Sequence, residues 1–369
     1  MPRLAQMIPE PTQKIDFVTS VPLDLMHAMY FTSLVVQMEG VDGWPEQVRS
    51  RMRQDLLGEL DALYNYPAGD PGLMGTLGDN LFARPDLWGN LQSLISYVRD
   101  LPLGIGDTAG TNVGVQGLIY QTTFRYLDER DRQPYQGLPP REAIQRRLES
   151  LDDRDAASIM ALYDRAEELP LRMSRLIERF YEEHYRHEMP RRLARLERSV
   201  AAHRRQPITD VAELARRLTG RPGTCLDNSI CPGPYDALVF APSLDMGPYA
   251  SCAVVGKVHG LFYPCEPEYR GEQPEDEDVT RLARIYKALG DEQRLRILAM
   301  LQERPMYVQE IVERAGLHQS VVSRHLVFMK AVGLVQARRE NNMKFYSLNP
   351  AIGEELGKTL ELFAHTVPV

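Results

Sequence analysis

The sequence has no long apolar run and no export signal. None of its uninterrupted apolar stretches approaches the roughly 18 residues that a membrane-spanning helix needs. The first residues, MPRLAQMIPEP, contain neither the apolar core nor the small-residue cleavage site of a secretory signal. These absences are typical of a cytoplasmic protein, and we expect no membrane partner.

The sequence also lacks an excess of positive charge. The 51 acidic residues outnumber the 43 lysines and arginines, which gives a formal net charge of −8. This balance argues against a surface coated with basic residues, although a DNA-binding module needs only a local basic face. A chain of 369 residues, 43% of them hydrophobic, is typical of a soluble globular protein with two or three domains.

An acidic segment divides the chain. Residues 265–279, CEPEYRGEQPEDEDV, contain seven acidic residues, two prolines and a glycine but almost nothing apolar. Because such a segment cannot bury enough surface to form a core, we expect a solvated linker at 266–278. The linker separates an N-terminal domain, residues 1–265, from a C-terminal domain, residues 279–369.

The N-terminal domain is expected to be mainly helical and to end in a small β-sheet, which makes the fold class mainly α (α+β). Helices are expected where apolar residues recur at helical spacing, and strands where β-branched and aromatic residues lie between glycines and prolines. In residues 153–205, a break near Pro170 or Pro190 predicts two helices. The other expected helices are 24–38, 45–64, 85–102, 113–130 and 210–218, and the strands lie in 14–20, 236–243 and 250–264.

The C-terminal domain shows the pattern of a winged helix-turn-helix. Helical spacing covers 279–290, 292–303, 308–316 and 319–333, and residues 334–348 alternate as two strands of a hairpin. Gly290-Asp291 separates the first two helices, and Gly316-Leu317 forms the tight turn before the fourth, the recognition helix. The apolar residues expected on one face of each helix are Leu282, Ile285, Tyr286, Leu289, Leu295, Leu298, Leu301, Ile311, Ala315, Val322, Leu326 and Met329.

The recognition helix and hairpin concentrate positive charge. From His318 to Ser347, five lysines and arginines accompany one acid, Glu340. This excess predicts a face for double-stranded DNA, on which polar side chains of the recognition helix reach base edges and hairpin arginines hold phosphates. The candidate DNA-binding residues are Gln319, Ser320, Ser323, Arg324, His325, Lys330, Arg338, Arg339, Asn341, Asn342 and Lys344.

Two motifs in this domain resemble the ArsR-type family of winged-helix repressors. ALGDEQRLRILAML (288–301) meets the pattern Ala-Leu-x-Asp-x-x-Arg-Leu-x-Ile-Leu, and QSVVSRHL (319–326) meets Gln-x-x-Val-Ser-x-His-Leu. The resemblance implies a homodimer that binds an inverted repeat through its recognition helices, with the first and last helices of the domain at the dimer interface. Residues 348–365 would supply the last helix. His318 stands where the family usually has a serine that caps the recognition helix.

The metal-binding positions of that family carry no suitable ligands here. Its thiolate pair falls on Tyr307 and Gln309, and the last helix offers glutamates with a lone histidine, His365. His184 and His187 share a helical face, but the charged residues around them favour a solvated surface. The remaining metal candidates are Cys225, Cys231, Cys252 and Cys265, whose spacings of five and twelve intervening residues do not match the two to four of zinc ribbons.

The N-terminal domain remains as the sensor. It is too large for a dimerisation arm alone, and its apolar helices supply either a pocket or ordinary core. No nucleophile elbow, phosphate loop or paired-carboxylate signature appears, so we expect neither enzymatic activity nor a cofactor. We predict a homodimeric one-component repressor with a small-molecule effector; the alternatives are a cysteine-based metal or redox sensor and an enzyme fused to a DNA-binding module. The pocket candidates are Met26, Met29, Tyr30, Phe31, Trp88 and Tyr97.

Overall fold

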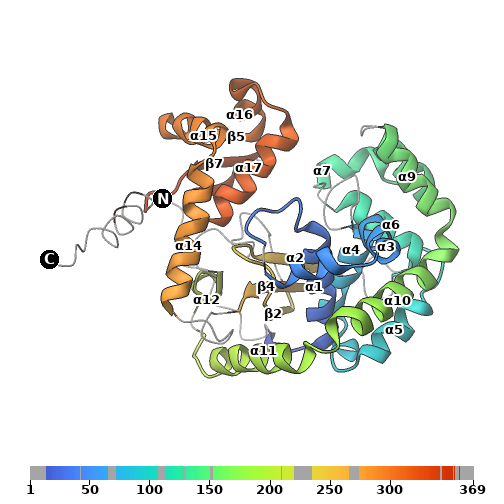
Figure 1. Cartoon of the computed structure of the whole chain (residues 1–369). Coiled ribbons are helices and arrows are strands. Elements are labelled where there is room, and N and C mark those ends of the chain that lie inside the picture. Colours follow the sequence, from blue (N-terminus) through green and yellow to red (C-terminus); the bar gives the residue numbers. More distant parts are fainter. Residues whose placement is uncertain are drawn as a thin grey trace.

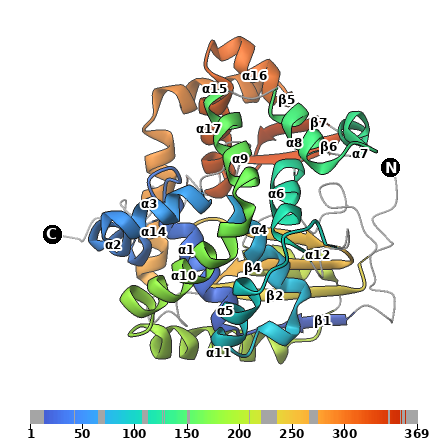
Figure 2. The same cartoon turned by 90° about the vertical axis from the view of Figure 1, so that its right-hand side faces the viewer.

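A mainly helical body precedes a smaller module of helices and strands (Figure 1). Helix α14 (Pro274–Leu289) runs from the level of the body to that module in both views (Figures 1 and 2). The predicted class, mainly α with a small sheet and a C-terminal winged helix, is confirmed. No described helix is long and apolar enough to cross a membrane. The computed structural model describes residues 14–41, 43–64, 72–106, 113–125, 127, 129–149, 153–208, 210–219, 235–265, 274–340, 343–351, 353 and 357.

The sheet of the body joins the start of the described chain to the segment before the acidic linker. β1 (Lys14–Phe17), β2 (Ala237–Ser243) and β4 (Val258–Pro264) run parallel to one another. β3 (Ser251–Val255) forms an antiparallel hairpin with β4, so the order is β1-β2-β4-β3. All three predicted strand regions therefore meet in one sheet.

Helices cover both faces of this sheet. Because side chains alternate along a strand, Phe240 packs with α11 and α12 on one face, whereas the neighbouring Val239 faces the core that contains α1. Figure 2 shows α11 and α12 beside the strands. The helices of the body are α1 (Val21–Leu34), α2 (Trp44–Arg51), α3 (Gln54–Tyr64), α4 (Gly72–Asn80), α5 (Leu91–Arg99), α6 (Val115–Phe124), α7 (Glu129–Arg132), α8 (Pro140–Leu148), α9 (Asp153–Asp164), α10 (Leu169–Phe180), α11 (Met189–Arg204) and α12 (Val211–Thr219).

The prediction of two helices in residues 153–205 was wrong, because three are present: α9, α10 and α11. Pro170 and Pro190 lie in the first turns of α10 and α11, where the missing proline N–H costs no hydrogen bond. A π-helical turn, Tyr181–Tyr185, follows α10 and contains His184. The prolines therefore start helices in this region.

Helix α1 is buried on nearly every side, so polar residues within it need partners inside the body. Asp24 accepts hydrogen bonds from the Arg192 guanidinium at 2.8 and 3.0 Å and from the Tyr185 hydroxyl at 2.5 Å. Arg192 also forms an ion pair with Asp245, which follows β2. This network fixes α1 against α11 and the loop between β2 and β3.

The C-terminal module has the predicted order of elements. Ile285, Ile297 and Leu301 belong to its core, as do Val322 and Met329. A three-stranded sheet, in the order β5-β7-β6, completes the module. After α14 come α15 (Glu292–Glu303), β5 (Met306–Tyr307), α16 (Val308–Ala315), α17 (Gln319–Ala331), β6 (Val335–Glu340) and β7 (Met343–Leu348).

Two details of this module differ from expectation. Leu295 is 48% exposed, because Arg294, Ile297 and Leu301 take the inward positions of α15. Helix α14 begins at Pro274, within the acidic segment, where proline and acidic residues favour a helix start.

The hairpin register pairs Glu340 with Met343, which leaves two residues, 341 and 342, for the connection. Both lie outside the described residues, as does most of the expected last helix, 348–365.

Candidate nucleic-acid interface

The recognition helix α17 is fixed by its turn and by its apolar face. Gly316 ends α16 with φ of +64°, a left-handed conformation that a glycine adopts without strain. Val322, Leu326 and Met329 are buried on one side of α17, as predicted, whereas Gln319, Ser320 and Arg324 are exposed. His318 stands at the N-cap but makes no side-chain capping bond. The helix is therefore held by its core contacts and by the turn.

The predicted DNA-binding side chains are mostly accessible. Arg324 is exposed and forms no ion pair with any residue in the described ranges, so its charge is available to a phosphate. The Lys344 ammonium lies 5.3 Å from the centroid of the Tyr346 ring, and both residues belong to the central strand β7. Asn341, Asn342 and the side chain of Arg339 lie outside the described residues. Gln319, Ser320, Arg338 and Lys344 are exposed, whereas Ser323, His325 and Lys330 are half-buried.

His325 is directed toward α15. Its Nδ1 accepts a hydrogen bond from the Arg294 Nε–H at 3.1 Å, because an arginine can only donate. Its Nε2 lies 2.9 Å from the Gln293 Oε1 and therefore carries the proton. Burial is the main cause that lowers the pKa of His325, which favours this neutral form. Its two nitrogens are thus engaged with α15.

Arg294 links the recognition helix to the helical body. Its side chain is only 4% exposed, and its guanidinium lies over the Phe328 ring at 4.8 Å from the centroid. The same guanidinium forms an ion pair with Glu39, which follows α1 in the body. In Figure 1 the segment after α1 rises beside α17. One arginine therefore contacts His325, Phe328 and Glu39 together.

The body holds Glu39 in place from its other side. The Tyr249 hydroxyl donates to the Glu39 carbonyl at 2.7 Å, from the loop between β2 and β3. Gly40 has φ of +80°, and a Cβ added there would lie 3.2 Å from Pro248 and 3.3 Å from Phe328. The left-handed φ favours a glycine at position 40, and a side chain there would also press against Pro248 and Phe328. We call the contact of Glu39 and Gly40 with Arg294 and Phe328 the interdomain joint.

Sequence reasoning did not single out the residues of this joint. In the sequence, Arg294 stands out only as part of the family motif. The signal that could have identified it is an arginine at an inward position of α15. Glu39 carries no local signal, because its partner lies 255 positions further along the chain.

Among the described residues, the metal candidates are not brought together. His184 lies in the π-helical turn and is partly buried, which is the main cause that lowers its pKa, whereas His187 is exposed in the turn that follows. Cys265 is buried, Cys252 lies on β3, and Cys225 and Cys231 fall outside the described residues. Within the described part of the chain, no group of three or more His, Cys, Asp or Glu side chains is placed to hold a metal ion.

At the family's thiolate positions, the Tyr307 ring packs edge-on against Phe345 at 6.0 Å between centroids. The Gln309 side chain donates to Glu313 at 3.4 Å. Both residues therefore make contacts within the module itself.

The predicted pocket residues separate into three groups. Met26 and Tyr30 border a cavity, whereas Met29 and Phe31 are fully buried in the core around α1. Trp88 donates from its Nε1 to the Leu81 carbonyl at 2.6 Å, and Tyr97 lies beneath the Arg84 guanidinium. Two of the six candidates therefore reach a cavity.

The comparisons with known proteins all concern the C-terminal module. The family model described as "Bacterial regulatory protein, arsR family" matches residues 291–337. The transcriptional activator HlyU of Vibrio cholerae is 40% identical over 65 residues, which are 18% of this chain and 60% of the relative. The uncharacterized HTH-type transcriptional regulator MJ1325 of Methanocaldococcus jannaschii is 39% identical over 71 residues, which are 19% of this chain and 80% of the relative.

Solved structures match the same region. HlyU from Vibrio cholerae aligns with 31% identity and a TM-score of 0.20, over 23% of this chain and 94% of that chain. The homodimeric winged helix-turn-helix domain Mb0332 from Mycobacterium bovis aligns with 28% identity and a TM-score of 0.22, over 25% of this chain and 86% of that chain. With the family model and the curated relatives, the motifs and geometry above identify the module: the chain belongs to the ArsR family of winged helix-turn-helix transcriptional regulators.

Proposed function

We propose that this DNA-binding regulator is a homodimeric one-component repressor whose DNA affinity is set by an effector on the helical body. The observation that carries the proposal is Arg294, which touches the recognition helix through His325 and the body through Glu39. A displacement of Glu39 in the body therefore acts directly on the position of α17.

The geometry of α17 supports such coupling. Phe328, which packs against Gly40 of the body, lies four residues after Arg324, so the two side chains project from neighbouring turns of the same helical face. A ligand that favours one position of the body shifts the recognition helix only through differential affinity for the two states. The interdomain joint is the contact through which this difference in ligand affinity would change the affinity of the recognition helix for DNA.

Exposed apolar residues support the homodimer. Val279 on α14 is 66% exposed, and Tyr286, seven residues later, is exposed on the same helical face. Leu295 on α15 adds a third exposed apolar side chain to the module. A second copy of the chain is the partner we infer, and the Mb0332 domain, similar to this module, is described as homodimeric.

The dimer would present two recognition helices to successive major grooves about 34 Å apart, on an inverted repeat. Arg324, Lys330 and Arg338 would supply phosphate contacts, and Gln319 and Ser320 would reach base edges. From the similarity to ArsR-type repressors we infer that the protein represses transcription and that it acts in the cytoplasm.

The test is selection of bound duplexes from a random pool by the full-length chain, followed by sedimentation of the complex. We expect a selected inverted repeat whose half-sites are about one helical turn apart, bound by two chains. Enrichment of no sequence, or one chain bound to a single half-site, would contradict the proposal.

A further inference from the structure

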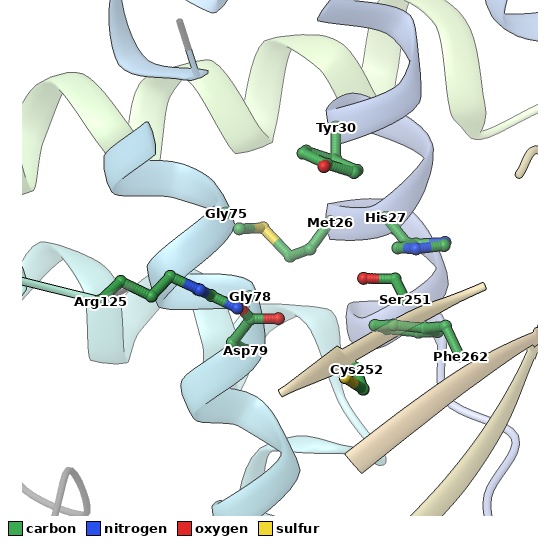
Figure 3. Close-up of a pocket in the computed structure, with 10 residues that line it drawn as sticks. All are labelled: Met26, His27, Tyr30, Gly75, Gly78, Asp79, Arg125, Ser251, Cys252 and Phe262. Atoms are coloured by element: carbon green, nitrogen blue, oxygen red, sulfur yellow. The ribbon is translucent and has the colours of Figure 1, made fainter. Parts of the chain in front are cut away.

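A cavity lies in the helical body between α1, α4 and the strands β3 and β4 (Figure 3). Its enclosed volume is about 80 Å³, within about 490 Å³ of empty space that includes the open mouth. A closed cavity that binds benzene measures about 150 Å³, so the enclosed part alone is smaller than one ring. A ligand with one ring would therefore occupy the open mouth as well as the enclosed part.

One wall of the cavity is charged but balanced. Asp79 on α4 forms an ion pair with Arg125, which follows α6, and Figure 3 shows the two side chains meeting beside Met26. Burial is the main cause that raises the pKa of Asp79, while Arg125 opposes that shift. Because the pair carries no net charge, the wall favours an uncharged ligand, and the carboxylate accepts hydrogen bonds from it.

The opposite wall contains a hydrogen-bond donor without an acceptor. His27 on α1 borders the cavity and is only 5% exposed, and its Nδ1 lies 2.8 Å from the Ser243 Oγ. Burial, with a smaller contribution from Arg192, lowers the pKa of His27 to about 3, so the ring is neutral. The Ser243 hydroxyl also accepts from the Asp245 N–H at 3.4 Å.

These contacts favour one tautomer of His27. When the Ser243 hydroxyl donates its proton to His27 Nδ1, every polar atom of Ser243 has a partner and the imidazole hydrogen lies on Nε2. The Nε2 atom has no hydrogen-bond partner among the described residues. A buried donor without an acceptor is costly, and a ligand oxygen that reached it would remove that cost.

The remaining walls favour a flat apolar molecule. The His27 and Phe262 rings are stacked at 3.8 Å between centroids, and Met26 and Tyr30 contribute further apolar surface. Ser251 and Cys252 on β3 also border the cavity, as Figure 3 shows. An aromatic ring gains contact with such walls through dispersion and ring packing.

We propose that this cavity binds a small uncharged aromatic compound that carries both a hydroxyl donor, directed to Asp79, and an oxygen acceptor, directed to His27 Nε2. The inference rests on the proposed function, since it assigns the effector site of that regulator. The route to DNA is short: α1 carries Met26, His27 and Tyr30 and leads directly to Glu39 of the interdomain joint.

The probe for the test is 4-hydroxyacetophenone, which has one ring, a hydroxyl donor and a ketone acceptor. Binding to the full-length chain is measured by calorimetry. Two comparison compounds are measured in the same way: ethylbenzene, which lacks polar groups, and 4-hydroxybenzoate, which carries a negative charge. We expect saturable binding of the probe, at least tenfold tighter than binding of either comparison compound.

Two variants and one control locate the site. Ser251→Leu fills the cavity from β3, and His27→Phe keeps a ring over Phe262 but removes the donor. Each should weaken probe binding at least tenfold, whereas Ser50→Leu, at an exposed serine of α2, should leave it unchanged. Circular dichroism of each variant verifies folding, so one folded cavity variant suffices for the comparison.

Protection of Cys252 gives a readout that does not depend on any variant. Saturating probe should slow modification of Cys252 by N-ethylmaleimide at least fivefold, measured on its peptide by mass spectrometry. Cys265, buried and outside the cavity lining, serves as the internal control.

Absence of probe binding, equal binding of ethylbenzene, or unchanged binding by folded Ser251→Leu would each overturn the site. Site-specific binding without any change in DNA affinity would leave the ligand site standing and would instead refute effector control in the proposed function. Release of DNA when the probe binds the unaltered cavity would support both the ligand site and effector control.

Discussion

Replacing Glu39 with glutamine perturbs the interdomain joint while keeping the shape of the side chain. The Arg294 guanidinium has three other close partners, namely the His325 ring, the Lys287 carbonyl at 3.5 Å and the Phe328 ring, and all of them are uncharged. Glu39 is therefore the one carboxylate in direct contact with this charge among the described residues. Glu39→Gln leaves a buried guanidinium without its counter-ion.

The expected magnitude lies between two limits. Breaking a fully buried ion pair costs about 3–5 kcal/mol, whereas an exposed pair contributes about 0.2–1 kcal/mol. Arg294 is 4% exposed but Glu39 is 34% exposed, so solvent screens part of the interaction. We expect the joint to lose about 1–2 kcal/mol, which speeds its local opening roughly 5- to 30-fold.

Hydrogen exchange resolved by peptide measures this opening directly. Amides in residues 35–41 and 319–331 should exchange roughly 5- to 30-fold faster in Glu39→Gln, while those of α5 should not change. The matched control is Glu213→Gln, which removes an exposed ion pair with Arg216 on α12. Equal exchange at the joint in both variants, or no acceleration in either, would refute the reasoning.

Two further predictions concern the body. Arg192→Leu leaves Asp24 and Asp245 buried without a counter-ion, so the free energy of unfolding should fall by about 3–5 kcal/mol in urea denaturation, and an unchanged midpoint would contradict this network. Burial lowers the folded-state pKa of His27 to about 3 and of His259 to about 4, so between these values and roughly pH 6.5 the unfolded chain binds protons that the folded chain does not. Stability should therefore be highest above that pH and fall below it by up to about 1.4 kcal/mol per pH unit for each histidine; urea midpoints that stay constant from pH 7.5 to 5 would exclude this linkage.

The C-terminal module was predictable because its signals are local. Apolar residues at helical spacing placed Val322, Leu326 and Met329 in the core, and Gly316 marked the turn before the recognition helix. The error at Leu295 has a physical reason: Arg294 turns inward on α15 to meet partners that lie far away in the sequence. Periodicity alone cannot predict a buried charge whose counter-ion is so distant.

The body was predictable as helices and strands, but its polar interior was not. Asp24 and His27 occupy a helix that is buried on nearly every side, and their partners Arg192 and Ser243 come from elements far along the chain. The cavity likewise depends on how α1, α4 and β3 pack, which no single segment encodes. Among the candidate DNA-binding residues, His325 contacts Arg294 and Gln293 of α15. The local spacing of residues in the sequence did not predict these contacts.

The most direct measurement is the salt dependence of DNA affinity for Arg324→Ala against wild type, on the selected inverted repeat. Each lost phosphate contact lowers the slope of log K against log salt by about 0.9, so a dimer that loses two contacts should show a slope smaller by about 1.8 together with weaker binding. Arg141→Ala, at an exposed arginine of α8 in the body, removes the same charge and should change neither value. If Arg324→Ala matches Arg141→Ala in both slope and affinity, the recognition helix does not contact DNA and the account fails.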